Sequence, residues 1–471
     1  MRRLSEAETL AVSEAGDFVF LAEDELDVLQ HDPNSLAPAR LAELQSKFFL
    51  RSAISSGMDR LLASRILTKH ETILRGPSLH ILVTTLHCAH SCRYCQVSRS
   101  LDAEGFTMSK SDLEAAIGTI FESPAAALTV EFQGGDPLLR FDLIRRAVDM
   151  IEKRNLTERK ALRFVVASTL HQLNEEMCEF FRAHEVYLST SVDGPAALHN
   201  RNRPLPTRDA YERTVRGINV ARALMGAGAV AALTTVTRDS LDCPEEIVDE
   251  YVRLGFHEIF IRPLSHYGFA RRNRAALSYS TSDFRTFYER AFNRVLYWNR
   301  QGVDLREVTA SIALNKILSP FDAGYVDLQS PTGYGLAVLV YNYDGYVYPS
   351  DEARMVAECG DTSLRLGRIG EPMKALLESR VQKALIESSL SEVAIDCSDC
   401  AYNRYCGPDP ISAYNQWGSV SVPAGLTEHC HRHIGLFDFL FQRLRQSDSW
   451  FEELAYRWAK PLVSQATLPN A

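Results

Sequence analysis

From Leu79 to Arg262 short runs rich in β-branched residues alternate with amphipathic stretches, and this alternation restricts the fold more than any other feature. The predicted strands are Leu79–Thr85, Leu128–Gln133, Arg163–Ser168, Val186–Ser191, Ala229–Val236 and His257–Arg262. The predicted helices between them are Ser111–Glu122, Phe141–Arg154, Leu173–His184, Asp209–Met225 and Pro244–Leu254. Strands that alternate with helices form parallel β/α units. Barrels of such units carry their chemistry where the strands end, so residues that follow the strands are the first candidates for a site.

Three cysteines follow the first predicted strand. Cys88, Cys92 and Cys95 stand in LHCAHSCRYCQ with the spacing C-x3-C-x2-C. Clustered thiolates hold iron–sulfur clusters, and three thiolates leave one iron of a four-iron cluster open, as catalytic metal sites do. The alternatives are a zinc knuckle and three unrelated core cysteines. Structural zinc requires four ligands, which usually begin with C-x2-C.

The spacing, with Tyr94 just before the last cysteine, resembles the signature of the radical S-adenosylmethionine (SAM) enzymes. The resemblance implies the α/β fold class, with a partial (β/α)6 barrel. It also implies a SAM-binding [4Fe-4S] cluster whose open iron chelates the amino and carboxylate groups of SAM. An external electron donor would reduce the cluster, which then cleaves SAM to a 5′-deoxyadenosyl radical.

A glycine-rich element follows the second predicted strand. Gly134, Gly135 and Asp136 precede a proline, and two glycines let backbone approach a ligand closely. The run resembles the GGEP element that holds the amino group of SAM in this superfamily, with Asp in place of the commoner Glu. The alternative is an ordinary Gly-Gly turn.

Polar residues also follow the third and fourth predicted strands. Ser168 and Thr169 are candidates for a SAM-contacting hydroxyl, and a helix N-cap explains them equally well. Ser191 and Asp193 belong to a run that resembles the S-x-D-G-P element of peptide-modifying radical SAM enzymes. In those enzymes the Ser and the Asp lie near the ribose and methionine parts of SAM.

A second cysteine group has the spacing C-x2-C-x5-C with a distant fourth member, and it comprises Cys397, Cys400, Cys406 and Cys430. It resembles the SPASM extension of peptide- and protein-modifying radical SAM enzymes. Ser350 and Pro410 stand where ligands of a first auxiliary cluster would be, so the resemblance implies one auxiliary [4Fe-4S] cluster. Four cysteines also suit tetrahedral zinc. His429, His431 and His433 flank Cys430 and are expected at the surface or outside the ligand set.

The segment before the barrel has a different pattern. Strand-like runs at Thr9–Val12 and Phe18–Leu21 form a predicted hairpin, and helical patterns follow. This resembles the small winged-helix-like elements that hold leader peptides by strand addition; the alternative is a structural cap. The predicted domains are residues 1–75, the barrel at 76–304, the SPASM-like domain at 305–435 and packing helices at 436–471.

Across nearly the whole chain the motifs resemble the His-Xaa-Ser system radical SAM maturases. The resemblance rests on Gly76–Ile81, the SCRYCQVSR run, Gly134–Pro137, Asp344–Glu352 and the second cysteine group. It implies a ribosomally made His-Xaa-Ser precursor peptide as substrate and a second maturase as partner. The rival interpretations are a protein oxidase like the sulfatase-maturating enzymes, which usually keep both auxiliary clusters, and a non-enzymatic iron–sulfur or zinc scaffold.

Composition narrows the class of protein. A net charge of −9 argues against nucleic acid as a partner. No apolar run reaches the roughly 18 residues of a membrane span, and no signal peptide is recognisable at the N-terminus. Most of the ten cysteines fall in or near the two groups, which indicates metal ligation rather than disulfides. We therefore expect a cytoplasmic enzyme without a membrane partner.

Overall fold

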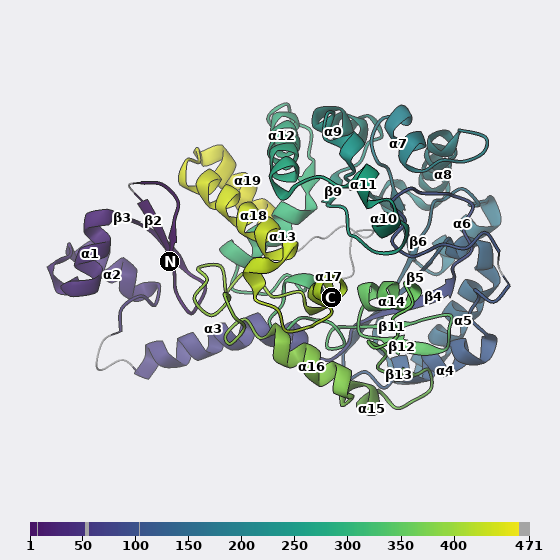
Figure 1. Ribbon diagram of the computed structural model, residues 1–471, viewed down its shortest axis with the longest axis horizontal. Coiled ribbons are helices and arrows are strands. Elements are labelled where there is room, and N and C mark those ends of the chain that lie inside the picture. The colour runs from purple at the N-terminus through teal and green to yellow at the C-terminus, as the bar shows by residue number, and fades with distance from the viewer. Residues whose placement is uncertain (7, 52–55, 103, 461–471) are drawn as a thin grey trace. The chain divides into compact units, whose positions relative to one another are not determined.

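The computed structural model describes residues 1–6, 8–51, 56–102 and 104–460 (Figure 1). The chain divides into two compact units. The barrel unit contains residues 75–309 and 334–385, and the second unit contains residues 1–74, 310–333 and the described residues from 386 onward.

The barrel unit is built on a ten-stranded sheet with the order β10-β9-β8-β7-β6-β5-β4-β11-β12-β13. The strands are β4 Leu79–Thr85, β5 Ala127–Gly134, β6 Ala161–Ala167, β7 Val186–Ser191, β8 Val230–Thr235, β9 Glu258–Arg262, β10 Arg306–Glu307, β11 Val338–Tyr341, β12 Tyr346–Tyr348 and β13 Gly367–Arg368. Every neighbouring pair from β10 to β11 in this order is parallel. The strand β12 pairs antiparallel with both β11 and β13. The order is linear, so the described sheet is an open, partial barrel.

Helices of the barrel unit follow the strands along the chain (Figure 1). They are α4 Lys110–Ile120, α5 Phe141–Glu158, α6 Glu175–Ala183, α7 Ala196–Asn202, α8 Ala210–Met225, α9 Pro244–Arg253, α10 Gly268–Arg272, α11 Arg274–Leu277, α12 Thr281–Arg300, α14 Asp351–Glu358, α15 Met373–Leu377 and most of α16 Arg380–Ser389. All six predicted strands and all five predicted helices are confirmed, with ends that move by a few residues. The α/β fold class is confirmed too.

Residues 334–385 lie in the barrel unit, whereas the sequence suggested that they belong to a domain at 305–435. The strand β11 pairs with β4 through register partners such as Val338 and Leu79. A four-residue buried strand far along the chain carries no local signal of which sheet it extends. The pairing of β11 with β4 in the tertiary structure, rather than a local sequence pattern, therefore decides that this segment belongs to the barrel unit.

The second unit begins with the antiparallel sheet β1-β2-β3, formed by β1 Arg2–Arg3, β2 Glu8–Val12 and β3 Phe18–Ala22. Its helices are α1 Glu23–His31, α2 Pro38–Ser46, α3 Ser56–Leu74, most of α13 Val308–Leu318, α17 Pro410–Trp417, α18 Glu428–Arg445 and α19 Ser449–Ala459. The predicted hairpin and the helices after it are present. Buried Val19, Leu21 and Leu44 form a core between the sheet and α2.

The C-terminal helices α18 and α19 contribute buried side chains to the second unit. Buried aromatic side chains line them, among them Phe437, Phe441 and Trp458. Residues 461–471, the end of the segment predicted at 436–471, lie outside the described residues. Within the described ranges, none of the helices combines the length and apolar character that crossing a membrane requires.

Candidate active site

The first cysteine group lies on the loop that follows β4. The amide of Cys88 donates to the carbonyl of Ser100 at 3.1 Å, and the amide of Cys95 donates to the carbonyl of Cys92 at 3.2 Å. Burial is the main cause that raises the pKa of Cys92 to about 12; Arg203 opposes the change and Cys95 adds to it. The pKa of Cys88 is raised by burial and by both other cysteines. A bound metal is what deprotonates such thiols.

Gly134 and Gly135 join the end of β5 to this loop. The amide of Gly135 donates to the carbonyl of Thr85 at 2.7 Å, and the amide of Asp136 donates to that of His87 at 2.8 Å. A Cβ atom on Gly134 would lie 1.9 Å from the Thr85 oxygen, and one on Gly135 would lie 2.2 Å from the Leu86 oxygen. The glycines therefore permit backbone-to-backbone contact beside the cysteine loop.

Asp136 is 1% exposed, and its carboxylate is held by hydroxyl groups from the end of β6. Ser168 donates to one oxygen at 2.7 Å and Thr169 donates to the other at 2.5 Å. Burial raises the pKa of Asp136, and these two hydrogen bonds oppose that change. Neither residue is the N-cap of the next helix, because Asn174 caps α6. The structure thus brings Ser168 and Asp136 together beside the cysteine loop.

Asp193 follows β7 and is fully buried. The hydroxyl of Tyr94 donates to its two carboxylate oxygens at 2.8 and 2.7 Å. Arg203 donates to the same carboxylate at 3.2 Å, and its guanidinium lies 5.2 Å from the centre of the Tyr94 ring. Asp193 therefore anchors the cysteine loop through the residue next to Cys95. Ser191 lies at the end of β7 and is partly exposed.

His90, between Cys88 and Cys92, was not singled out from the sequence. It is 1% exposed, and neither ring nitrogen has a hydrogen-bond partner among the described residues. Its ring centre lies 5.6 Å from that of His171. Buried polar atoms without partners mark places where a bound group completes the structure. Together with the three thiols, this orphaned imidazole fits a site that holds a cluster and its cofactor.

The second cysteine group lies in the other unit, and its four members line one hollow with about 680 Å³ of empty space, part of it open to solvent. Cys397 and Cys400 lie on a tight turn in which the Cys400 amide donates to the Cys397 carbonyl at 3.0 Å. Cys430 lies in the first turn of α18, which Thr427 caps. The pKa of Cys406 is raised by burial and by the other three thiols. Four converging cysteines can ligate an iron–sulfur cluster or tetrahedral zinc.

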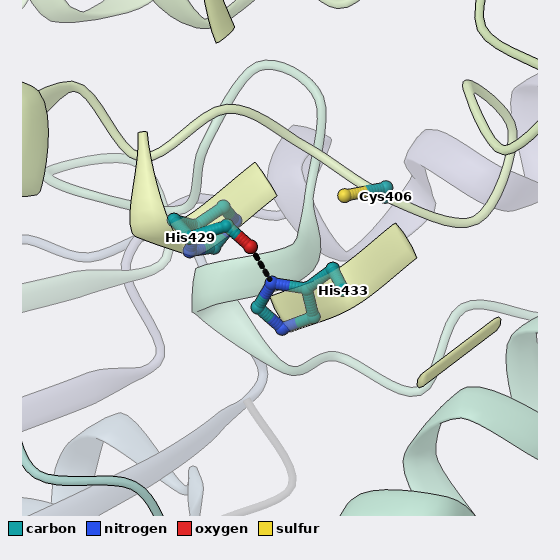
Figure 2. Close-up of side chains that lie close together, drawn as sticks. All are labelled: Cys406, His429 and His433. Atoms are coloured by element: carbon teal, nitrogen blue, oxygen red, sulfur yellow. Dashed lines mark hydrogen bonds between the residues drawn. The ribbon is translucent and has the colours of Figure 1, made fainter. Parts of the chain in front are cut away.

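Two histidines of α18 also approach Cys406 (Figure 2). The sulfur of Cys406 and one ring nitrogen each of His429 and His433 lie within 4.8 Å of one another. His429 donates through Nε2 to the carbonyl of Gly407, and His433 donates through Nδ1 to the carbonyl of His429, both at 2.9 Å. Of the two expectations for these histidines, a surface position holds for exposed His431. His429 is 5% exposed because α18 turns that side chain inward, so a position outside the ligand set stays the prediction for it.

Ser350 and Pro410 have structural roles that need no metal. The hydroxyl of Ser350 accepts from the amide of Ala353 at 3.3 Å and caps α14. Pro410 is the first residue of α17, where proline is favoured.

Residues 82–260 match the sequence profile of the Radical SAM superfamily. The chain is similar to the cysteine-type anaerobic sulfatase-maturating enzyme of Clostridium novyi (strain NT), with 22% identity over 340 residues, 71% of this chain and 87% of that one. It is 21% identical over 382 residues to the enzyme of the same name from Clostridium perfringens (strain 13 / Type A), covering 78% of this chain and 98% of that one.

Two of the similar solved structures cover most of this chain. Native anSMEcpe with bound AdoMet, which is SAM, has a TM-score of 0.65 and 19% identity and covers 80% of this chain and 99% of its own. Streptococcus suis SuiB bound to precursor peptide SuiA has a TM-score of 0.54 and 11% identity and covers 91% of this chain and 100% of its own. At these identities the similarity establishes the fold.

Proposed function

We propose, on the premise that residues 82–260 match the Radical SAM superfamily, that the protein is a maturase of a ribosomally made peptide. Cys88, Cys92 and Cys95 hold a [4Fe-4S] cluster that reductively cleaves SAM. The 5′-deoxyadenosyl radical then abstracts a hydrogen atom from the peptide. The observation that carries this proposal is the group of three thiols on the loop after β4, which leaves one iron of a four-iron cluster open.

The residues around that loop suit SAM. Asp136 presents a carboxylate fixed by two hydroxyl groups, and a carboxylate accepts hydrogen bonds from an ammonium group such as that of the methionine part of SAM. In this proposal Ser168 and Gly134–Asp136 form the amino-group side of the site. Ser191 contacts the ribose side, and Asp193 positions the loop through Tyr94.

A second cluster is part of the proposal. Cys397, Cys400, Cys406 and Cys430 ligate one auxiliary [4Fe-4S] cluster. Zinc is the second candidate, favoured by the approach of His429 and His433 to Cys406, because imidazole and thiolate together are common zinc ligands.

The substrate we propose is a His-Xaa-Ser precursor peptide, with an external electron donor and a second maturase as partners. Support comes from the fold shared with SuiB, which binds a precursor peptide, and from the small sheet and helices of residues 1–74. The similarity to sulfatase-maturating enzymes supports a protein oxidase as the rival. Ser350 and Pro410, which begin helices in place of cluster ligands, speak against it.

The first test measures SAM cleavage. Under anaerobic, reducing conditions the protein should convert SAM to methionine and 5′-deoxyadenosine, and Cys92→Ala should remove that activity without unfolding the barrel. Undiminished deoxyadenosine formation by Cys92→Ala would contradict the assignment of these cysteines to the cluster.

Co-expression with a His-Xaa-Ser peptide, read by mass spectrometry, tests the substrate. A loss of two mass units indicates oxidative cross-linking, and an unchanged peptide rejects this substrate.

Metal analysis of the same preparations separates the two candidates for the second site. Two four-iron clusters give about eight irons per chain, whereas zinc gives about four irons and one zinc. Joint substitution of Cys397, Cys400 and Cys406 by Ala should remove half the iron. His433→Gln should leave the iron unchanged if four cysteines are the ligands, and it should release zinc if the imidazole is a ligand.

A further inference from the structure

Glu131 and Gln133 place a polar pair on one face of β5. Their neighbours Val130 and Phe132 are fully buried, whereas Glu131 and Gln133 are partly exposed. Side chains of a strand alternate between its two faces. One face of β5 is therefore packed into the apolar core, and the other presents a carboxyl group and an amide.

The strand pairing continues this face across the sheet, with apolar and polar side chains on it; the register partner of Glu131 on β6 is buried Val165. Thr129, on the same face as Glu131, is the register partner of Arg163 on β6. Following the register from β6 to β9 puts Ser191 and Arg262 on that face as well. All of these polar side chains except Thr129 are partly exposed, and Ser191 is one of the proposed SAM contacts. The face that carries Glu131 thus continues to the edge where the cofactor site lies.

Glu131 has one hydrogen bond in the described part of the chain, accepted from Nε2 of Gln133 at 2.8 Å. Its pKa is raised to about 7, chiefly because the protein encloses it; the hydrogen bond from Gln133 opposes this change, Asp351 of α14 adds to it, and Arg262 and Arg163 oppose it. On β4 the register partner is apolar Ile81. A carboxyl group in this setting exists in both protonation states near neutral pH, which is the condition for efficient proton transfer.

We propose that Glu131 is the catalytic proton acceptor of the reaction, taking the proton that the peptide loses after hydrogen abstraction. This inference rests on the proposed function and adds to it the residue that handles the proton. Gln133 positions the carboxylate by its hydrogen bond.

The step balances as follows for a product with two fewer hydrogens. One C–H bond breaks, and its hydrogen atom goes to the deoxyadenosyl radical. One N–H, O–H or S–H bond of the peptide also breaks, its proton goes to Glu131, and the heteroatom forms a bond to the carbon radical. The remaining electron goes to an oxidised iron–sulfur cluster, the class of acceptor that the second cysteine group provides in the proposed function.

The experiment compares the wild type with Glu131→Gln, which keeps the shape of the side chain and removes the proton acceptor. The control is Glu212→Gln, at an exposed side chain of α8. The probe is a perdeuterated His-Xaa-Ser peptide. Glu131→Gln should still transfer deuterium into 5′-deoxyadenosine, while the product that is lighter by two hydrogens falls about 100-fold. Glu131→Asp should restore part of the product. Equal product from Glu131→Gln, or loss of deuterium transfer together with product, would overturn the proposal.

A second readout needs no peptide. Infrared difference spectra of the holoenzyme between pH 5 and 9 should show a carboxyl group that titrates near neutrality in the wild type and in Glu212→Gln. The signal should be missing in Glu131→Gln, and its persistence there would contradict the assignment. Failure of the proposed function is visible separately, because the wild type would then transfer no deuterium from the peptide into deoxyadenosine.

Discussion

Tyr94 shows how one side chain can connect the cysteine loop to the sheet. Its hydroxyl donates to a carboxylate that has no solvent access. Burial raises the pKa of Tyr94, and the carboxylate of Asp193 raises it further, so the phenol remains a donor at any ordinary pH. Ninety-nine residues separate the two partners, yet their contact sets where Cys95 lies.

The residue-scale prediction is that Tyr94→Phe destabilises the protein and weakens its hold on iron. The substitution leaves a buried carboxylate with fewer donors, and a hydrogen bond to a charged group contributes about 1.5–3 kcal/mol. We expect the free energy of unfolding of the metal-free protein to fall by that amount and iron per chain to drop after reconstitution. Tyr297→Phe, at a side chain that is 45% exposed, is the control. Unchanged unfolding and iron content in Tyr94→Phe would show that the contact is not an anchor.

At the scale of elements, the end of β5 and the loop after β4 are held together by backbone contact. Gly135 has no side chain to separate them, and its amide donates a hydrogen bond to the carbonyl of Thr85, the last residue of β4. Because the cysteine loop starts at this junction, the strand that supplies Asp136 also supports the loop that supplies the thiols.

The prediction at this scale is that Gly135→Ala disturbs the cysteine loop. The new Cβ would lie 2.2 and 2.4 Å from the carbonyl oxygens of Leu86 and His87, so the two backbones must separate. Overpacking of this kind costs about 1–3 kcal/mol, and iron retention should fall with stability. Gly118→Ala in α4 meets no atom within 4 Å and should stabilise that helix by up to about 1 kcal/mol. Equal free energies of unfolding for the two variants in denaturant titrations would show that the close backbone contact at Gly135 does not support the cysteine loop.

At the scale of the whole molecule, residues 1–74 share a compact unit with the second cysteine group. The rings of Phe18 and Phe441 lie 5.0 Å apart, and the hydroxyl of Tyr405 donates to the carbonyl of Gly16 at 2.9 Å. Deleting the N-terminal segment would therefore expose buried aromatic residues of the C-terminal extension. A test of peptide recognition must instead change the edge of the small sheet.

The strand β3 is one of the two edges of this sheet. Side chains of α2 and of its C-cap donate hydrogen bonds to carbonyl groups of β3. Arg40 donates to the carbonyl of Phe20 at 2.8 Å, and Lys47 donates to that of Phe18 at 3.2 Å. A leader peptide that binds by strand addition must displace these donors. Arg40→Gln should therefore tighten binding of the N-terminal part of the His-Xaa-Ser peptide by up to about tenfold, which is the effect of one such hydrogen bond. Fluorescence anisotropy measures this affinity. Arg51→Gln, at an exposed pair with Asp59, should bind like the wild type. An unchanged or weaker affinity for Arg40→Gln would return the segment to the role of a structural cap.

The sequence by itself determined the features that depend on local spacing. The alternation of strands and helices follows from periods of two and 3.6 residues, and the three cysteines after β4 lie within eight residues of one chain segment. The contacts that complete the site are not local. The pairing of Tyr94 with Asp193, the inward turn of His429, the addition of β11 to the barrel sheet and the joining of residues 1–74 with residues 386–460 in one unit depend on segments far apart in sequence. Only the packed tertiary structure decides them, because burial and hydrogen bonding select partners in space and leave no periodic pattern along the chain.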